Sequence, residues 1–218
     1  MHLLVELWRS TVGRKALAAV SGLLLSGWVV LHVAGNLTLF RGAAVTDGYA
    51  ATLRDAPAAL WAVRLGLVFA IVVHVATVTS LTRTGLVARP RHEARASRRA
   101  STVAAGSMRV GGTLLLAFIA YHVLHLTFGV SHPGFRPGHV YDNVVIGLRP
   151  AWVAAVYVGA AAVLSLHLFH GLWATAVSLG VRLDVAAKRR RPVVAALSAA
   201  VALGFASVPL AVLAGWLR

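Results

Sequence analysis

The 218-residue chain has no cysteine and only six acidic residues. Without cysteine the chain has no disulfides, no thiolate metal site, no iron–sulfur cluster of its own, and no cofactor attached through a C-x-x-C-H motif. Charged residues make up 12% of the sequence, against about 25% in soluble domains, and apolar residues make up 59%. This small number of charged residues cannot cover the surface of a soluble globular protein. The sequence therefore indicates a protein of the lipid bilayer.

Five long runs are nearly free of charged residues, and each approaches the roughly 20 residues that a helix needs to cross the hydrocarbon core. Arg64 is the one formal charge inside these runs, the third of which is Val110 to Val130. The sequence therefore predicts a single domain over 1–218, an all-α integral membrane bundle of five transmembrane helices. The expected spans are about 16–40, 58–82, 104–130, 151–181 and 193–217.

None of the six acidic residues falls inside a charge-free run, as the cost of desolvating a carboxylate in lipid requires. The spans therefore offer no buried carboxylate for proton transfer. The acidic residues are Glu6, Asp47, Asp55, Glu93, Asp142 and Asp184.

The net charge of +15 would suit nucleic acid, but its distribution fits a membrane instead. Fifteen of the 21 Lys and Arg residues lie in segments 1–16, 83–109 and 182–191, which five crossings place on one side of the bilayer. By the positive-inside rule this side is cytoplasmic, so the N-terminus is expected inside and the C-terminus outside. The basic segment 89–99 is either a solvated topology signal or a docking surface for a partner or anionic lipid.

Six histidines lie inside four of the five spans, where ionisable residues are costly. A single such histidine is most often a hydrogen-bonded packing residue. Here each of the first four spans carries at least one histidine and the fifth carries none, which is what a four-helix bundle holding haem between pairs of neutral imidazoles needs. These histidines are His32, His74, His122, His125, His167 and His170.

The depths of the histidines suggest how they pair. At 1.5 Å of rise per residue, His32 and His122 lie roughly 14 to 17 Å from the outer ends of their spans, and His74 and His167 lie about 25 Å from them. This sorting pairs the first span with the third and the second with the fourth. We therefore expect two haems about 10 Å apart in depth, with their iron held by His32/His122 and by His74/His167.

Four further residues belong to the expected site. His125 and His170 each lie three residues beyond an expected ligand on nearly the same helix face, so spacing leaves them as second choices for iron. Arg64 and Arg109, inside or at the edge of a span, are candidates to bind the anionic haem propionates. The alternative for both arginines is snorkelling to the membrane interface.

Several strings resemble the single-chain, five-helix cytochrome b subunit of succinate dehydrogenase and fumarate reductase, over essentially the whole chain. They are GRKALAAVSGLLL leading to HVAGNL around His32, RVGGTLLLAFIAYHVLHLTFG around His122, and LHLFHGLW around His167. The H-x-x-G-N string that begins at His32 is fairly specific. The resemblance implies that His32, His74, His122 and His167 are the axial ligands of two b-type haems, which agrees with the depth sorting.

The resemblance also implies what such a subunit does. It anchors a flavoprotein and an iron–sulfur protein on the cytoplasmic face of the bacterial plasma membrane and passes electrons between the iron–sulfur subunit and quinone, without being catalytic alone. The Ala-, Val- and Arg-rich composition is similar to proteins of actinobacteria, which usually use menaquinone. Some relatives carry a glutamate two residues before the fourth-span histidine to help protons cross, and Ser165 here puts that path in doubt.

Two rival functions remain open, and the quinone site has no clear signature. One rival is the di-haem anchor of a membrane hydrogenase or another reductase, which copurification with a succinate-oxidising flavoprotein would exclude. The other is a transporter that uses the histidines for metal or protons, which a lack of Soret absorbance would favour. For quinone, Asp47, Tyr49, Arg64 and His139 are outer-side candidates, with ordinary loop polarity as the alternative explanation.

Overall fold

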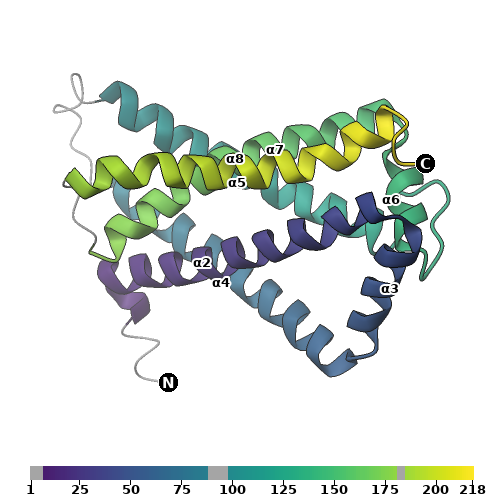
Figure 1. The fold of residues 1–218 in the computed structure, drawn as a ribbon. Helices are drawn as coiled ribbons and strands as arrows, with labels where there is room; N and C mark the ends of the chain where they lie inside the picture. Colours follow the sequence, from purple (N-terminus) through teal and green to yellow (C-terminus); the bar gives the residue numbers. More distant parts are fainter. Residues whose placement is uncertain (1–6, 88–97, 181–184) are drawn as a thin grey trace.

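The structure, a computed structural model, describes residues 7–87, 98–180 and 185–218, which are helical and contain no strand. Five long helices form a bundle, and shorter helices gather at one end of it (Figure 1). The long helices are α2 (Thr11–Asn36), α4 (Pro57–Val87), α5 (Arg98–Leu126), α7 (Ala151–Ser178) and α8 (Val185–Leu213). The short ones are the 3₁₀-helix η1 (Leu37–Arg41), α3 (Ala43–Arg54) and α6 (Val140–Leu148).

All five long helices are long and apolar enough to cross a membrane, which confirms the predicted all-α fold with five such helices. The apolar spans run over Thr11–Arg41, Pro57–Gly85, Gly106–Leu126, Ala151–Ser178 and Arg191–Leu213. Helix α2 begins at one end of the bundle and the C-terminus lies at the other (Figure 1), as an odd number of crossings requires. We call the end that carries α3, α6 and the C-terminus the α6 end, and the opposite end the N-terminal end.

Most span boundaries differ from the prediction by a few residues, and two of the differences have local reasons. Helix α2 begins at Thr11, earlier than expected, because the side chain of Ser10 caps it: the Gly13 N–H donates to Ser10 Oγ at 2.8 Å. Helix α5 ends at Leu126 and not at 130, because the chain turns at Gly129 with φ of 69°, a conformation that favours glycine.

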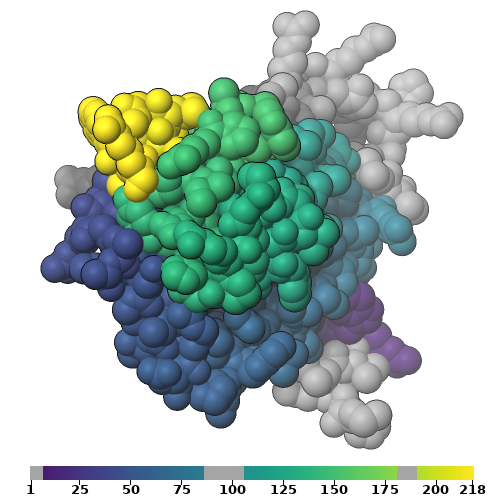
Figure 2. All heavy atoms as spheres, turned by 90° about the vertical axis from the view of Figure 1, so that its right-hand side faces the viewer, coloured from purple at the N-terminus to yellow at the C-terminus, as the bar shows by residue number. Residues whose placement is uncertain are grey.

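The segments 41–57 and 131–150, which connect predicted spans, each contain a helix. Helix α6 is largely buried, and its Tyr141 N–H donates to Asp47 Oδ1 at 2.9 Å, which joins α6 to α3. Figure 2 shows α6 and its loop covering the end of the bundle, beside α3 and the C-terminus. Prolines and glycines flank α6 and do not interrupt its first two turns.

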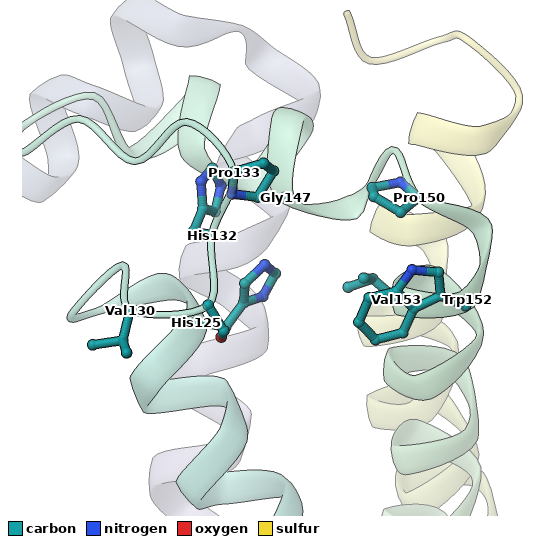
Figure 3. Close-up of a pocket in the computed structure, with 9 residues that line it drawn as sticks. His125, Val130, His132, Pro133, Gly147, Pro150, Trp152 and Val153 are labelled. Atoms are coloured by element: carbon teal, nitrogen blue, oxygen red, sulfur yellow. The ribbon is translucent and has the colours of Figure 1, made fainter.

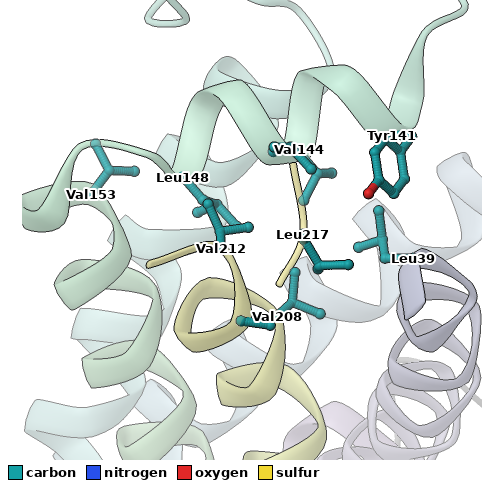
Figure 4. Close-up of a cluster of buried hydrophobic side chains, with 10 residues drawn as sticks. Leu39, Tyr141, Val144, Leu148, Val153, Val208, Val212 and Leu217 are labelled. Carbon is teal, nitrogen blue, oxygen red and sulfur yellow. The ribbon is translucent and has the colours of Figure 1, made fainter. Parts of the chain in front are cut away.

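A cluster of buried apolar side chains also lies at the α6 end, where α6, η1 and the end of α8 meet (Figure 4). Along the spans, many large side chains are exposed; Phe69 and Leu203 are each 71% exposed. Outward-facing apolar side chains are expected where lipid replaces water as the solvent. The buried cluster comprises Leu39, Tyr141, Val144, Val145, Leu148, Val153, Val208, Ala211, Val212 and Leu217.

Helix α7 packs against α8, α5 and α2, and α2 packs in turn against α4. Helix α8 also contacts α2, and the close approach occurs at Gly204, where an added Cβ would lie 2.5 Å from Val33 Cγ2. A small residue at a helix contact allows this backbone approach. The four histidine-bearing helices are therefore held together, with α8 on the outside of the α2–α7 seam.

Candidate functional site

Histidines from the four bundle helices meet in two pairs. The ring centroids of His32 on α2 and His122 on α5 are 5.8 Å apart, with ring planes at 78°. Those of His74 on α4 and His167 on α7 are 6.4 Å apart, with planes at 70°. These are the two pairs expected from depth. We call His32/His122 the α6-side pair, because both residues lie about one turn from the helix ends at the α6 end, and His74/His167 the N-side pair.

The separation within each pair matches the span of two imidazoles across one metal ion. A metal–nitrogen bond is about 2 Å long and a ring centre lies about 1.2 Å behind the nitrogen, so two trans imidazoles place their centroids roughly 6.4 Å apart. The observed 5.8 and 6.4 Å lie close to this value. By distance, one iron atom fits between the rings of each pair.

Each pair offers only two protein ligands, which favours a metal ion that is already held by the other ligands of a cofactor. Among the described residues, no group of three or more His, Asp or Glu side chains lies close enough to hold a metal ion. A bare zinc ion takes at least three protein ligands, so isolated pairs suit it poorly. Haem carries four equatorial nitrogens of its own and needs only two axial ligands, which is what each pair offers.

The N-side pair has a hydroxyl that orients one ligand. Ser21 Oγ donates to the Leu17 carbonyl at 2.7 Å, so toward His74 Nδ1, 3.2 Å away, it acts as the acceptor. The proton of neutral His74 is thereby assigned to Nδ1, which leaves the Nε2 lone pair for a metal. Its partner His167 has a buried Nδ1 with no hydrogen-bond partner in the described part of the chain.

Glycines make room beside the N-side pair. A Cβ added at Gly22 would lie 3.2 Å from His74 Cε1, and one added at Gly112 would lie 3.4 Å from His167 Cε1. Two glycines on different helices thus approach the two rings of one pair, a cradle that larger side chains would fill. This close approach suits a flat macrocycle between the helices.

The α6-side pair is surrounded by aromatic rings and one phenol. The Tyr157 hydroxyl lies 3.4 Å from His122 Nδ1, a long contact, and 2.9 Å from His125 Nδ1. His32 differs from the other three histidines of the pairs, because its Nε2 lies 3.4 Å from Asn36 Nδ2. Iron binding through His32 Nε2 requires this amide to move aside. The rings around the pair are Trp28, Phe118, Tyr157 and Phe205.

The second-choice histidines have other surroundings. His125 is 1% exposed, stacks on Tyr121 with centroids 5.3 Å apart, and packs against His132 of the following loop. His170 lies beside Phe169, with centroids 5.2 Å apart. Neither has a histidine of another bundle helix across from it, so the geometry favours the first-choice ligands.

The two arginines expected near propionates are exposed. The Arg64 guanidinium lies over the Trp61 ring, 5.2 Å from its centroid, and Arg109 lies one turn before Gly112 on α5. Arg14, which sequence reasoning missed, is more enclosed.

Arg14 Nη1 donates to Ser80 Oγ at 2.7 Å and to Thr84 Oγ1 at 3.2 Å, which ties α2 to α4. Its Nε is buried without a partner in the described residues. Arg14 precedes Ser21 by two helical turns, which places it on the N-terminal side of the N-side pair. An unmatched guanidinium nitrogen at this depth is a candidate partner for a propionate.

A cavity of about 410 Å³ lies at the α6 end, between the end of α5, the loop that follows it and the start of α7 (Figure 3). None of the four outer-side polar residues named from the sequence as quinone candidates lines it. Its lining residues are His125, Val130, Ser131, His132, Pro133, Gly147, Pro150, Trp152 and Val153.

The basic segment 89–99, expected to be either a topology signal or a docking surface, lies largely outside the described residues. Comparisons of this chain with models of known families, with curated proteins and with solved structures give no match.

Proposed function

We propose that the chain is the membrane anchor and di-haem cytochrome b subunit of a succinate:quinone oxidoreductase. It passes electrons between an iron–sulfur partner subunit and a membrane quinone, with menaquinone as the expected quinone. The observation that carries the proposal is the meeting of His32 with His122 and of His74 with His167 at bis-imidazole distance. The sequence strings around these histidines support the choice of partner enzyme.

Haem bound at each pair would supply one-electron redox chemistry at two depths. The chain's own residues bind and orient it: imidazoles hold the iron, and Ser21 and Tyr157 fix the protonation of His74 and His122. Gly22 and Gly112 keep side chains away from the two rings of the N-side pair. Arg14, Arg109 and Arg64 are the cations proposed for propionates.

The orientation follows from charge. The basic segments place the N-terminal end in the cytoplasm, where the flavoprotein and iron–sulfur subunits would bind. Electrons from succinate would then enter at the N-side pair and leave at the α6-side pair, which lies about ten residues further along α2 and along α5, or roughly 15 Å. The described spans hold no acidic side chain.

Haem content and the spectra of ligand variants test the proposal. The purified complex should contain two b-type haems per chain, and His74→Ala and His122→Ala should each lose one. His170→Ala is the matched control, because His170 lies on the same helix as His167 but faces no histidine of another helix. A wild-type complex without Soret absorbance would contradict the proposal, as would loss of a haem from the control alone.

The partner enzyme needs a separate experiment. The chain, purified gently from its native membrane, should bring down a flavoprotein that oxidises succinate. Copurification with a hydrogenase or with a reductase inactive on succinate would contradict the choice of partner while leaving the di-haem site in place. Haem content and partner identity therefore test the two halves of the proposal independently.

A further inference from the structure

Two imidazoles line the cavity at the α6 end, and only one has a free ring nitrogen. His132 is fully bonded: its Nδ1 accepts from the Gly134 N–H at 3.0 Å and its Nε2 donates to the Asn143 carbonyl at 2.6 Å. His125 uses Nδ1 for the Tyr157 hydroxyl, and its Nε2 has no hydrogen-bond partner among residues 7–87, 98–180 and 185–218. His132 is thus part of the wall, and His125 is the group available to a ligand.

One phenol connects His125 to an expected iron ligand. If His122 binds iron through Nε2, its Nδ1 carries a proton and donates to the Tyr157 oxygen. The Tyr157 hydroxyl then donates to His125 Nδ1 at 2.9 Å. Neutral His125 must therefore carry its proton on Nε2, which makes it a donor for an acceptor atom in the cavity.

The cavity walls suit a flat, uncharged ring. A volume of about 410 Å³ lies within the range of roughly 300 to 1,000 Å³ of small-molecule sites. No Lys, Arg, Asp or Glu lines it, so nothing in the wall neutralises a charged ligand. Figure 3 shows His125 and His132 on one side, with Pro150 and Trp152 on the other.

The rim of the cavity is apolar and open. Trp152 is 66% exposed and Val130 is 76% exposed, and both lie next to the ends of membrane spans. Exposed tryptophans at span ends are typical of the membrane interface. A ligand with a ring in the cavity can therefore keep a long apolar tail among the lipid chains.

We propose that this cavity binds the ring of the quinone, with a quinone carbonyl accepting a hydrogen bond from His125 Nε2 and with Trp152 forming the opposite wall. The inference rests on the proposed function and names the place at which the quinone meets the α6-side pair. The bound ring is then linked to His122 through the side chains of His125 and Tyr157. This site lies apart from the polar residues that the sequence offered as quinone candidates.

Binding is measured on the intact complex by fluorescence quenching of an alkyl-hydroxyquinoline N-oxide, an analogue of the quinone ring, and by the KM for a short-chain naphthoquinone. His125→Phe removes the donor and retains a ring against Tyr121. Because His125 is 1% exposed and its replacement can disturb folding, Trp152→Ala supplies a second variant at an exposed position. Trp216→Ala is the matched control, since Trp216 is 81% exposed and does not line the cavity.

We expect Trp152→Ala and His125→Phe to weaken analogue binding and raise KM at least tenfold, with two haems retained and the control unchanged. Unchanged binding in Trp152→Ala with both haems present overturns this inference and leaves the proposed function standing. A wild-type complex that lacks haem overturns the proposed function itself, so the two failures are distinguishable by spectroscopy. An equal loss of binding in the Trp216 control also overturns the assignment to this cavity.

Discussion

The two histidine pairs present similar ring separations in different surroundings. Gly22, Gly112 and the Ser21 hydroxyl lie against the N-side pair, whereas aromatic rings and the Tyr157 phenol surround the α6-side pair. The α6-side pair also adjoins a cavity through His125. Ring separation limits what can bind between two imidazoles, whereas the side chains around them affect the redox potential of a bound group and the access of a ligand to it. We expect the N-side pair to relay electrons and the α6-side pair to exchange them with a ligand.

The largest expected effect comes from filling the N-side cradle. Gly22→Leu puts a branched side chain where even a Cβ lies 3.2 Å from His74, so the complex should lose the N-side haem and keep the other. Leucine has a higher helix propensity than glycine, so unfolding of the helix would not explain the loss of haem. The control is Gly27→Leu, because a Cβ at Gly27 meets nothing within 4 Å. The measurement is the number of haems per polypeptide. Two haems in Gly22→Leu would contradict a role for Gly22 in haem binding at the N-side pair.

A smaller effect should follow from removing the charge of Arg14. At about 10 Å and an effective dielectric of about 20, a unit charge contributes about 1.7 kcal/mol, or roughly 70 mV for one electron. Arg14→Gln should therefore lower the midpoint potential of the N-side haem and hardly move the other. Redox titration of both haems measures this. Arg64→Gln is the comparison variant, since Arg64 lies over Trp61, and a larger shift of the N-side haem there would contradict the assignment.

Removing either ligand-orienting hydroxyl should shift the potential of one haem upward. Ser21→Ala takes the acceptor from His74 and Tyr157→Phe takes it from His122, which makes each imidazole a weaker donor to ferric iron. A net hydrogen bond of about 0.5 to 1.5 kcal/mol corresponds to roughly 20 to 65 mV. Each variant serves as the control for the other in redox titrations. Equal shifts of both haems in one variant would show that the two environments are not independent.

The smallest expected effect is a loss of stability from a contact at the α6 end that involves no histidine. Asp47→Ala removes the acceptor for the Tyr141 N–H that joins α3 to α6, at a cost of about 1 kcal/mol, or roughly 2 to 4 °C in Tm. Both haems should remain. Arg136→Ala is the control: its ion pair with Asp142 is exposed, so Tm should change less. Loss of the α6-side haem in Asp47→Ala would show that this contact also positions the ligands.

The pairing of the histidines was predictable and their surroundings were not. Long apolar runs and a constant rise per residue are enough to place His32 level with His122 and His74 level with His167. Tyr157 gave no signal, because its partners are 32 and 35 residues away and a span tyrosine is usually assigned to the interface. The cavity is lined by the loop after α5 and by Gly147 of α6, and no sequence pattern indicated that these two segments meet.

Helix α8 has no histidine in its span, yet it touches the α6-side pair. The Phe205 ring lies 5.6 Å from the His32 ring, and the close approach at Gly204 holds α8 against Val33. A fixed benzyl group, and not a mobile acyl chain, therefore occupies one flank of His32. On this flank the polypeptide, and not lipid, sets the local permittivity, so a change in the lipid composition of the membrane should affect the His32 imidazole less from this side.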